Sequence, residues 1–186
     1  MNADSTNLHP RLAELVDDLH RSRRALHACV AALSDAQRLA APVGASWSVA
    51  QIVEHLSIVE GNVGRLLSNL MKEAEATGAR ETETTSVLTS LDQFGVDVPT
   101  VRIPAPDRVQ PKEGLTTHEA LARLDAVRDH LLSVIPRASG LPLATVSFPH
   151  PALGPLNGYE WILLIAQHER RHTRQIEAVA AASASA

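Results

Sequence analysis

The chain of 186 residues has little cysteine, few aromatic residues and no long apolar run, and each shortage excludes a class of protein. Its single cysteine, Cys29, excludes an intrachain disulfide and favours a reducing compartment. Aromatic residues make up only 3% of the chain, whereas alanine and leucine dominate its apolar residues, which disfavours a β-sandwich or barrel. Neither a secretory signal nor a run long enough to span a membrane is visible, so we expect a cytoplasmic protein with no membrane partner.

An excess of basic residues is also absent. The 17 Lys and Arg residues against 21 Asp and Glu residues give a formal net charge of −4. Such a chain lacks the basic surface that grips a phosphate backbone, so we expect no nucleic-acid partner. Its length is that of one domain, and 45% apolar residues suffice for a core of this size, which predicts a single domain over residues 1–186.

What the sequence does have is helical periodicity. Apolar residues recur at steps of three and four in four segments, at about 8–39, 49–76, 117–135 and 158–182. Three of these segments begin with a capping signal: Ser48 with Gln51, Thr116 with Glu119, and Asn157. Four long amphipathic helices predict an all-α fold, a four-helix bundle with a long crossover between its second and third helices.

Two connections are long and rich in proline, at 77–115 and 136–156. Long segments of this kind in a small domain tend to form lids or binding loops. The first is long enough to return along the bundle, so the helices that it joins can run parallel. The tail, 181–186, is of low complexity and is expected to fray.

The chemistry of the sequence lies in its histidines. His168 and His172 fall in the middle of the apolar face of the last helix, on the line that Ile165 and Ile176 continue. One turn apart, their Cβ atoms should be about 5–6 Å from each other, which lets both imidazoles reach one cation at about 2.0–2.1 Å. Buried without partners, each ring would cost about 1–3 kcal/mol, so a shared metal ion explains their placement better than apolar packing does.

His55 lies on the inner edge of the apolar face of the second helix. Metal sites in bundle cores are built from side chains on facing helices, so we expect His55 to join His168 and His172. Three histidine ligands leave a coordination position open, as in reactive rather than structural sites. Imidazoles alone suit zinc, nickel, copper or iron.

The remaining histidines and the cysteine are better explained by packing or exposure than by a role in a site. We expect surface or half-buried packing for the six remaining histidines: His9, His20, His27, His118, His130 and His150. Cys29 is interpreted as a buried small apolar residue.

The string from His168 to His172, HERRH, matches the zinc-peptidase pattern, but the only carboxylate after it, Glu177, lies on another side of the helix. The peptidase reading is therefore disfavoured, and Glu169 is taken as an ordinary residue on the helix flank, with a base or ligand-orienting role as the weaker alternative.

Two blocks of the sequence resemble the DinB-like superfamily. Residues 47–56 read WSVAQIVEHL, and residues 168–176 read HERRHTRQI, preceded by GYEW at 158–161. The two blocks bracket nearly the whole bundle. The resemblance implies a four-helix bundle with a long crossover, one divalent metal ion, commonly zinc or nickel, on His55, His168 and His172, and a homodimer. Characterised members include mycothiol-dependent maleylpyruvate isomerase, bacillithiol transferases and proteins described as metal-dependent hydrolases.

From these observations we expect a metal-dependent enzyme that transfers a low-molecular-weight thiol to a small-molecule electrophile. Arg171, Arg102 and Arg108 are candidates for binding carboxylates of the substrate. The side chains within a turn of the ligands that can orient the imidazoles are those of Gln51, Glu54 and Gln175. Metal-assisted hydrolysis needs the same open position, and a bundle that binds metal or a partner helix without catalysis is the third alternative.

Overall fold

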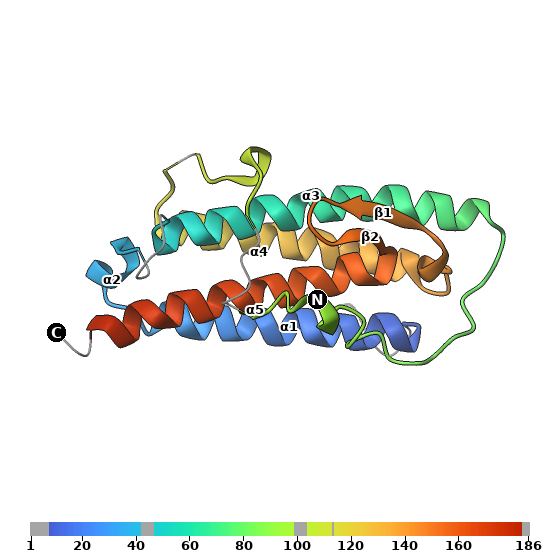
Figure 1. The fold of residues 1–186 in the computed structure, drawn as a ribbon, viewed down its shortest axis with the longest axis horizontal. Coiled ribbons are helices and arrows are strands. Elements are labelled where there is room, and N and C mark those ends of the chain that lie inside the picture. The colour runs from blue at the N-terminus through green and yellow to red at the C-terminus, as the bar shows by residue number, and fades with distance from the viewer. Residues whose placement is uncertain (1–7, 42–46, 99–103, 113, 184–186) are drawn as a thin grey trace.

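Four long helices form the body of the chain in the computed structural model, which describes residues 8–41, 47–98, 104–112 and 114–183 (Figure 1). They are α1 Pro10–Ala31, α3 Val49–Ala76, α4 Thr117–Val134 and α5 Gly158–Ser183. The predicted all-α four-helix bundle is therefore confirmed. No helix in these described ranges is long and apolar enough to cross a membrane. Residues 181–183 of the tail belong to α5, and 184–186 lie outside the described residues.

The first predicted helix, 8–39, is two helices in the structure. α1 ends at Ala31, and a short helix, α2, spans Asp35–Leu39. Ser34 starts the second helix: its hydroxyl accepts a hydrogen bond from the Gln37 amide, and the Gln37 side chain accepts one from the Ser34 amide. This capping box competes with continuation of α1, because it offers the backbone a new helix start at the same point.

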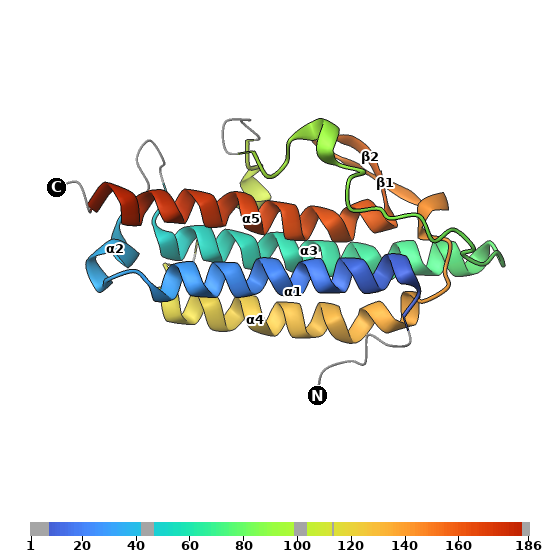
Figure 2. The same ribbon diagram turned by 90° about the horizontal axis from the view of Figure 1, so that it is seen from below.

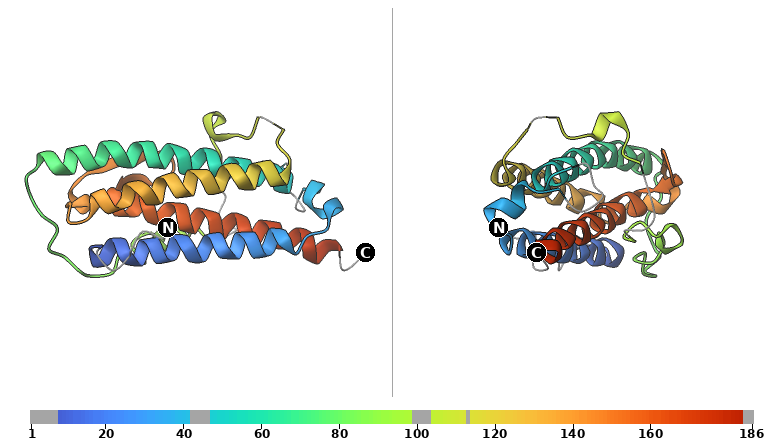
Figure 3. Two further views of the ribbon diagram at one scale, coloured as in Figure 1. Left: turned by 180° about the vertical axis from the view of Figure 1, so that it is seen from behind. Right: turned by 60° about the vertical axis from the view of Figure 1, so that its left-hand side comes forward.

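The helices run in two parallel pairs. α1 and α5 run in one direction, whereas α3 and α4 run side by side in the other (Figures 1 and 3). The long connection after α3 returns along the bundle before α4 begins. It thereby allows the parallel arrangement that its length predicted.

The expected capping residues begin the other helices. Ser48 with Gln51 and Thr116 with Glu119 form complete capping boxes at the starts of α3 and α4. At α5, the side-chain oxygen of Asn157 accepts hydrogen bonds from the amides of Tyr159 and Glu160 at 3.0 and 3.1 Å. These side chains satisfy amides that have no partner inside the helix, which explains why three helix starts were predicted to within a residue or so.

The two connections contain structure that the periodicity did not predict. The second carries a hairpin in which β1, Ser147–His150, pairs antiparallel with β2, Gly154–Asn157. The first carries short 3-10 turns, at Asp92–Phe94 and Asp107–Val109. Figure 2 shows that the hairpin and much of the first connection cover the side of the bundle formed by α5 and α3. Strands of four residues are too short to show alternation, which is why the sequence indicated only a loop.

A layer of four buried charges crosses the core. Each long helix contributes one side chain: Arg23 from α1, Glu60 from α3, Arg128 from α4 and Glu169 from α5. The four side chains form a closed ring of ion pairs, because each guanidinium binds both carboxylates. The Arg23–Glu169 and Arg23–Glu60 contacts measure 2.6 and 2.9 Å. The layer separates one apolar cluster around Leu12, Leu67 and Tyr159 from a second around Leu26, Ile52 and Leu124.

Backbone and hydroxyl groups complete the layer. The carbonyls of Leu19 and Leu124 accept from Arg128 and Arg23, and the Ser22 hydroxyl donates to Glu169. Asp125 binds Arg23 at 2.8 Å from the half-exposed edge of the layer. With two positive and two negative groups in contact, the buried layer is neutral overall, and it links all four long helices.

We expect the variant Glu60→Gln to lower the free energy of unfolding by about 3–5 kcal/mol, because it leaves two buried guanidinium groups with one buried carboxylate, that of Glu169, between them. Urea unfolding followed by circular dichroism measures the change. The matched control is Asp125→Asn, at the solvent-exposed edge of the same layer, which should cost less than about 1 kcal/mol. Equal losses in the two variants would show that the layer does not act as a buried unit.

Candidate metal site and pocket

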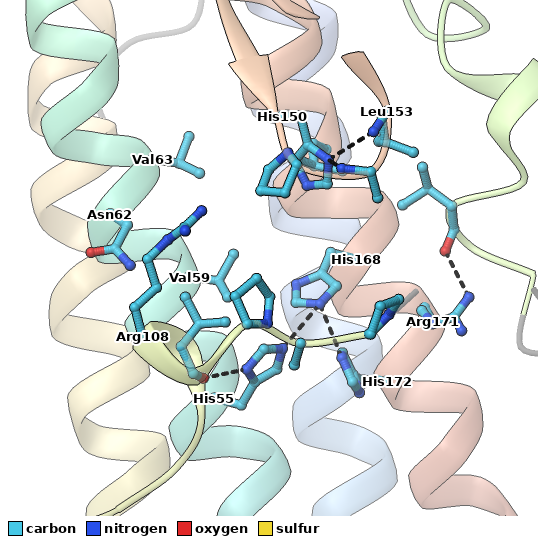
Figure 4. A pocket seen from close by; sticks show the side chains of 18 of the residues that line it. His55, Val59, Asn62, Val63, Arg108, His150, Leu153, His168, Arg171 and His172 are labelled. Atoms are coloured by element: carbon cyan, nitrogen blue, oxygen red, sulfur yellow. Dashed lines mark hydrogen bonds between the residues drawn. The ribbon is translucent and has the colours of Figure 1, made fainter. Parts of the chain in front are cut away.

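Three histidines from two helices meet beside α5. His168 and His172 lie one turn apart on α5, and His55 reaches them from the first part of α3 (Figure 4). The Nε2 atom of His168 lies 3.2 Å from Nε2 of His55 and 3.0 Å from Nε2 of His172. The structure thus brings together the three histidines that the sequence singled out.

Two of the rings are held by hydrogen bonds on their far side. Nδ1 of His55 lies 2.7 Å from the carbonyl oxygen of Val109, and Nδ1 of His172 lies 2.8 Å from the side-chain oxygen of Gln175. A carbonyl oxygen only accepts, so each Nδ1 carries the proton and donates it. The tautomer that results leaves the lone pair of Nε2 pointing at the other rings, which is the state that binds a metal ion.

Burial keeps these imidazoles uncharged. Loss of contact with water lowers the pKa of all three, that of His172 to about 3 and that of His168 well below its ordinary value. Mutual repulsion of protonated rings lowers the pKa of His168 and His172 further. Near neutral pH each ring therefore offers a free electron pair.

The spacing of the three nitrogens fits one metal ion. Tetrahedral coordination with ligand nitrogens at about 2.05 Å separates those nitrogens by about 3.3 Å, close to the 3.0 and 3.2 Å observed. All three candidate ligand atoms lie within 4.8 Å of one another. In the described part of the chain, this group contains no carboxylate or thiol. The three-histidine group could hold a metal ion and would leave a coordination position open.

The open side faces a large pocket. It has a volume of about 1450 Å³, above the roughly 300–1,000 Å³ typical of small-ligand sites. α3 and α5 form its floor, while the turn at Asp107–Val109 and the β1–β2 hairpin form its walls. Apolar residues that line the pocket include Trp47, Phe148, Leu153 and Trp161. The two long connections therefore build the walls of the site, as the expectation of binding loops implied.

Comparison with known proteins agrees with this architecture. The sequence model of the DinB superfamily matches residues 18–176, which includes all three histidines. The chain belongs to the DinB superfamily. This DinB superfamily chain is 25% identical over 148 residues to the uncharacterized protein YuaE of Bacillus subtilis (strain 168), covering 79% of this chain and 85% of that protein.

A solved structure supports the same fold for this DinB superfamily member. The crystal structure of TT2238, described as a four-helix bundle protein, matches with a TM-score of 0.59 and 24% sequence identity. The match covers 88% of this chain and 95% of the other. The likeness establishes the bundle and its connectivity over most of the chain.

Glu169 corrects one expectation from the sequence. It is not an ordinary flank residue, because it is 1% exposed and binds Ser22, Arg23 and Arg128 in the charged layer. Its carboxylate is thus engaged with α1 and α4, whereas the neighbouring His168 meets His55 of α3. This geometry agrees with setting the peptidase reading aside.

The three residues expected to orient the metal ligands make three different kinds of contact in the structure. Gln175 contacts His172, as described above. Gln51 uses its side-chain oxygen in the capping box with Ser48, and Glu54 accepts a hydrogen bond from the Lys112 amide at 2.8 Å. His55 is oriented instead by the Val109 carbonyl. Sequence reasoning missed this group because a backbone atom in a loop carries no residue-type signal.

The arginine candidates also differ in position. Arg171 lines the pocket and donates hydrogen bonds to the carbonyls of Val96 and Val98, which ties the first connection to α5. Arg108 lines the pocket from the turn at Asp107–Val109. Arg102 lies outside the described residues. His150, expected to be an ordinary loop residue, also lines the pocket.

Cys29 lies away from the pocket lining, on α1 beside the Thr173 carbonyl. Burial, aided by the negative charge of Glu177, raises the pKa of this thiol to about 11. At neutral pH the thiol is therefore protonated and a poor nucleophile. Cys29 is half-buried, however, whereas the sequence analysis expected it to be buried.

We expect iodoacetamide to alkylate Cys29 of the native chain at pH 7.5 about a hundredfold more slowly than Cys29 of the urea-unfolded chain, whose thiol has an ordinary pKa of about 8.5. The native rate should keep rising up to about pH 11, where the thiolate becomes the major form. Mass spectrometry reads the rate directly, since the chain has one cysteine. A plateau near pH 8.5 would contradict the prediction.

Proposed function

We propose that this chain is a divalent-metal enzyme that transfers a low-molecular-weight thiol to a small electrophile. The observation that carries the proposal is the convergence of three imidazole Nε2 atoms on the floor of a pocket large enough for two small reactants. Membership of the DinB superfamily agrees with it, since thiol transferases are among the enzymes that the sequence resembles. Zinc and nickel are the ions that we expect.

The residues of the chain have separate tasks in this proposal. His55, His168 and His172 would hold the ion, and Val109 and Gln175 keep two of those rings in the binding tautomer. When bound, such an ion lowers the pKa of a thiol at its open position, so that the sulfur is a thiolate at neutral pH. Apolar side chains, among them Trp47, Trp161 and Leu153, line the space beside the histidines.

The alternatives differ in what occupies the open position. Metal-assisted hydrolysis would use the same residues with water in place of the thiol. A non-catalytic metal site would be expected to enclose its ion, whereas these histidines line a spacious pocket. The expected homodimer and cytoplasmic location stay predictions.

We expect purified wild-type protein to contain one divalent ion per chain and His168→Ala to lose it, because two imidazoles alone bind a metal weakly. Elemental analysis with circular dichroism as a folding check measures both. The matched control is His130→Ala, an exposed histidine on α4, which should keep the metal. Metal-free wild-type protein after purification in zinc- or nickel-containing buffer would overturn the proposal.

Two glutamines refine this test. Gln175→Ala should weaken metal binding about tenfold, because it removes the acceptor that fixes the His172 tautomer. Gln51→Ala should leave metal affinity unchanged and lower only stability, by about 0.5–1.5 kcal/mol, because its side chain accepts one hydrogen bond at the start of α3. Competition with a chelator gives the affinities.

The thiol step has its own prediction. Cobalt-substituted protein should change its visible absorption spectrum on addition of small thiols, and turnover of electrophilic substrates should require a thiol. No spectral change with any thiol would contradict the thiol proposal while leaving the metal site intact. Turnover that proceeds without thiol would favour hydrolysis instead.

A further inference from the structure

The charges around the pocket are of one sign. Its described lining includes four arginines, at positions 65, 108, 171 and 174, and not one aspartate or glutamate. The chain as a whole is acidic, with 21 acidic residues against 17 basic ones, so the lining departs from the average surface. Clefts with one sign of charge and apolar walls concentrate ligands of the opposite charge.

Three of these guanidinium groups already have protein partners. Arg174 pairs with Asp97 at 3.4 Å, Arg65 donates to the Asn62 side chain, and Arg171 binds two backbone carbonyls. Arg108 differs from them, because no described residue accepts a hydrogen bond from it. Its five N–H donors are thus available to a ligand.

His150 offers a second donor to the same pocket. Its Nδ1 atom accepts hydrogen bonds from the amides of Ala152 and Leu153, both at 3.2 Å, inside the hairpin turn. Nδ1 therefore carries a lone pair, and the proton of the neutral ring sits on Nε2. The ring packs against Trp161 with 5.5 Å between centroids, which fixes its plane. A backbone turn thus defines which nitrogen is the donor.

Arg108 and His150 act on one region of the pocket. Both side chains line the pocket, and burial, together with the positive charge of Arg108, lowers the pKa of His150. Figure 4 shows both on the side of the pocket above the three histidines. Arg108 is exposed, and apolar side chains, among them Val59, Val63 and Leu153, line the same pocket.

We propose that the pocket selects a carboxylate-bearing ligand, whose carboxylate accepts hydrogen bonds from the Arg108 guanidinium and from Nε2–H of His150. A carboxylate matches this pair, because it has only acceptors and binds most strongly to a charged, planar donor. The placement of the ligand's reacting group near the histidines rests on the proposed function. Carboxylate binding itself does not.

Tryptophan fluorescence tests the inference without a metal signal. The two tryptophans of the chain, Trp47 and Trp161, both line the pocket, so a ligand there changes their emission. The full chain as purified is titrated at constant ionic strength with succinate and with its neutral diamide, succinamide. We expect succinate to bind at least about tenfold more tightly, as hydrogen bonds to a charged group allow.

Matched variants locate the effect. Arg108→Gln should weaken succinate binding about tenfold or more and leave succinamide binding unchanged. His150→Asn should weaken it about threefold or more, because asparagine keeps an acceptor for the turn amides and lacks the Nε2–H donor. Arg24→Gln, an equal loss of charge on the exposed face of α1, is the control and should bind like wild type. Circular dichroism confirms that each variant is folded.

A second pair of probes finds which reactant carries the carboxylate. 3-Mercaptopropionate and its neutral amide are compared on cobalt-substituted protein by visible absorption. A preference for the charged thiol alone assigns the carboxylate to the thiol, and a preference for succinate alone assigns it to the acceptor. Either result supports the inference.

Equal binding of charged and neutral probes in both pairs would overturn it, and so would wild-type affinity of Arg108→Gln for a charged probe that the wild-type chain prefers. These outcomes are separable from failure of the proposed function. A chain that binds no metal can still prefer succinate. Conversely, if the protein holds a metal ion but binds the charged and neutral probes equally, only this inference fails and the proposed function stands.

Discussion

The buried layer of Arg23, Glu60, Arg128 and Glu169 is the constraint on which the rest of the structure depends. Leucine stripes allow helices to slide or rotate at small cost, whereas four paired charges from four helices tolerate one register only, because any shift leaves a buried charge unpaired. Glu169 is next to His168 on α5, and Glu60 follows His55 on α3. The contacts that link the helices in this layer therefore also help to align the histidines.

The site also depends on the connections. A carbonyl in the first connection fixes the His55 ring, and Arg171 and Glu54 each bind backbone atoms of that connection. The second connection contributes the hairpin wall. Helices thus supply the convergent imidazoles, while non-helical chain supplies their orientation and the shape of the space above them. Because α3 and α4 run parallel, the first connection must return along the bundle, and this course brings Val109 to His55.

The helix starts and the three-histidine group could be predicted from the sequence. Capping boxes located the starts of α3 and α4, and the central position of His168 and His172 on an apolar face predicted that they share a partner. The role of Val109 could not be predicted, because it depends on a backbone oxygen that tertiary folding brings close to the His55 ring. The burial of Glu169 did leave a signal: Arg23, Glu60 and Arg128 each interrupt an apolar stripe at a position that helical spacing turns inward. Charges at such positions on four helices indicate mutual pairing.

The division between a helical floor and walls of connecting chain has a consequence for how such a protein can diversify. Substitutions in the hairpin or in the turn at Asp107–Val109 alter the shape and polarity of the cavity while the helices that carry the imidazoles stay in register. Closing a longer surface loop adds little to the free energy of folding, roughly 0.6 kcal/mol for each doubling of its length. One bundle can therefore enclose cavities of different shape through changes in two surface segments, while its helices keep the three histidines together.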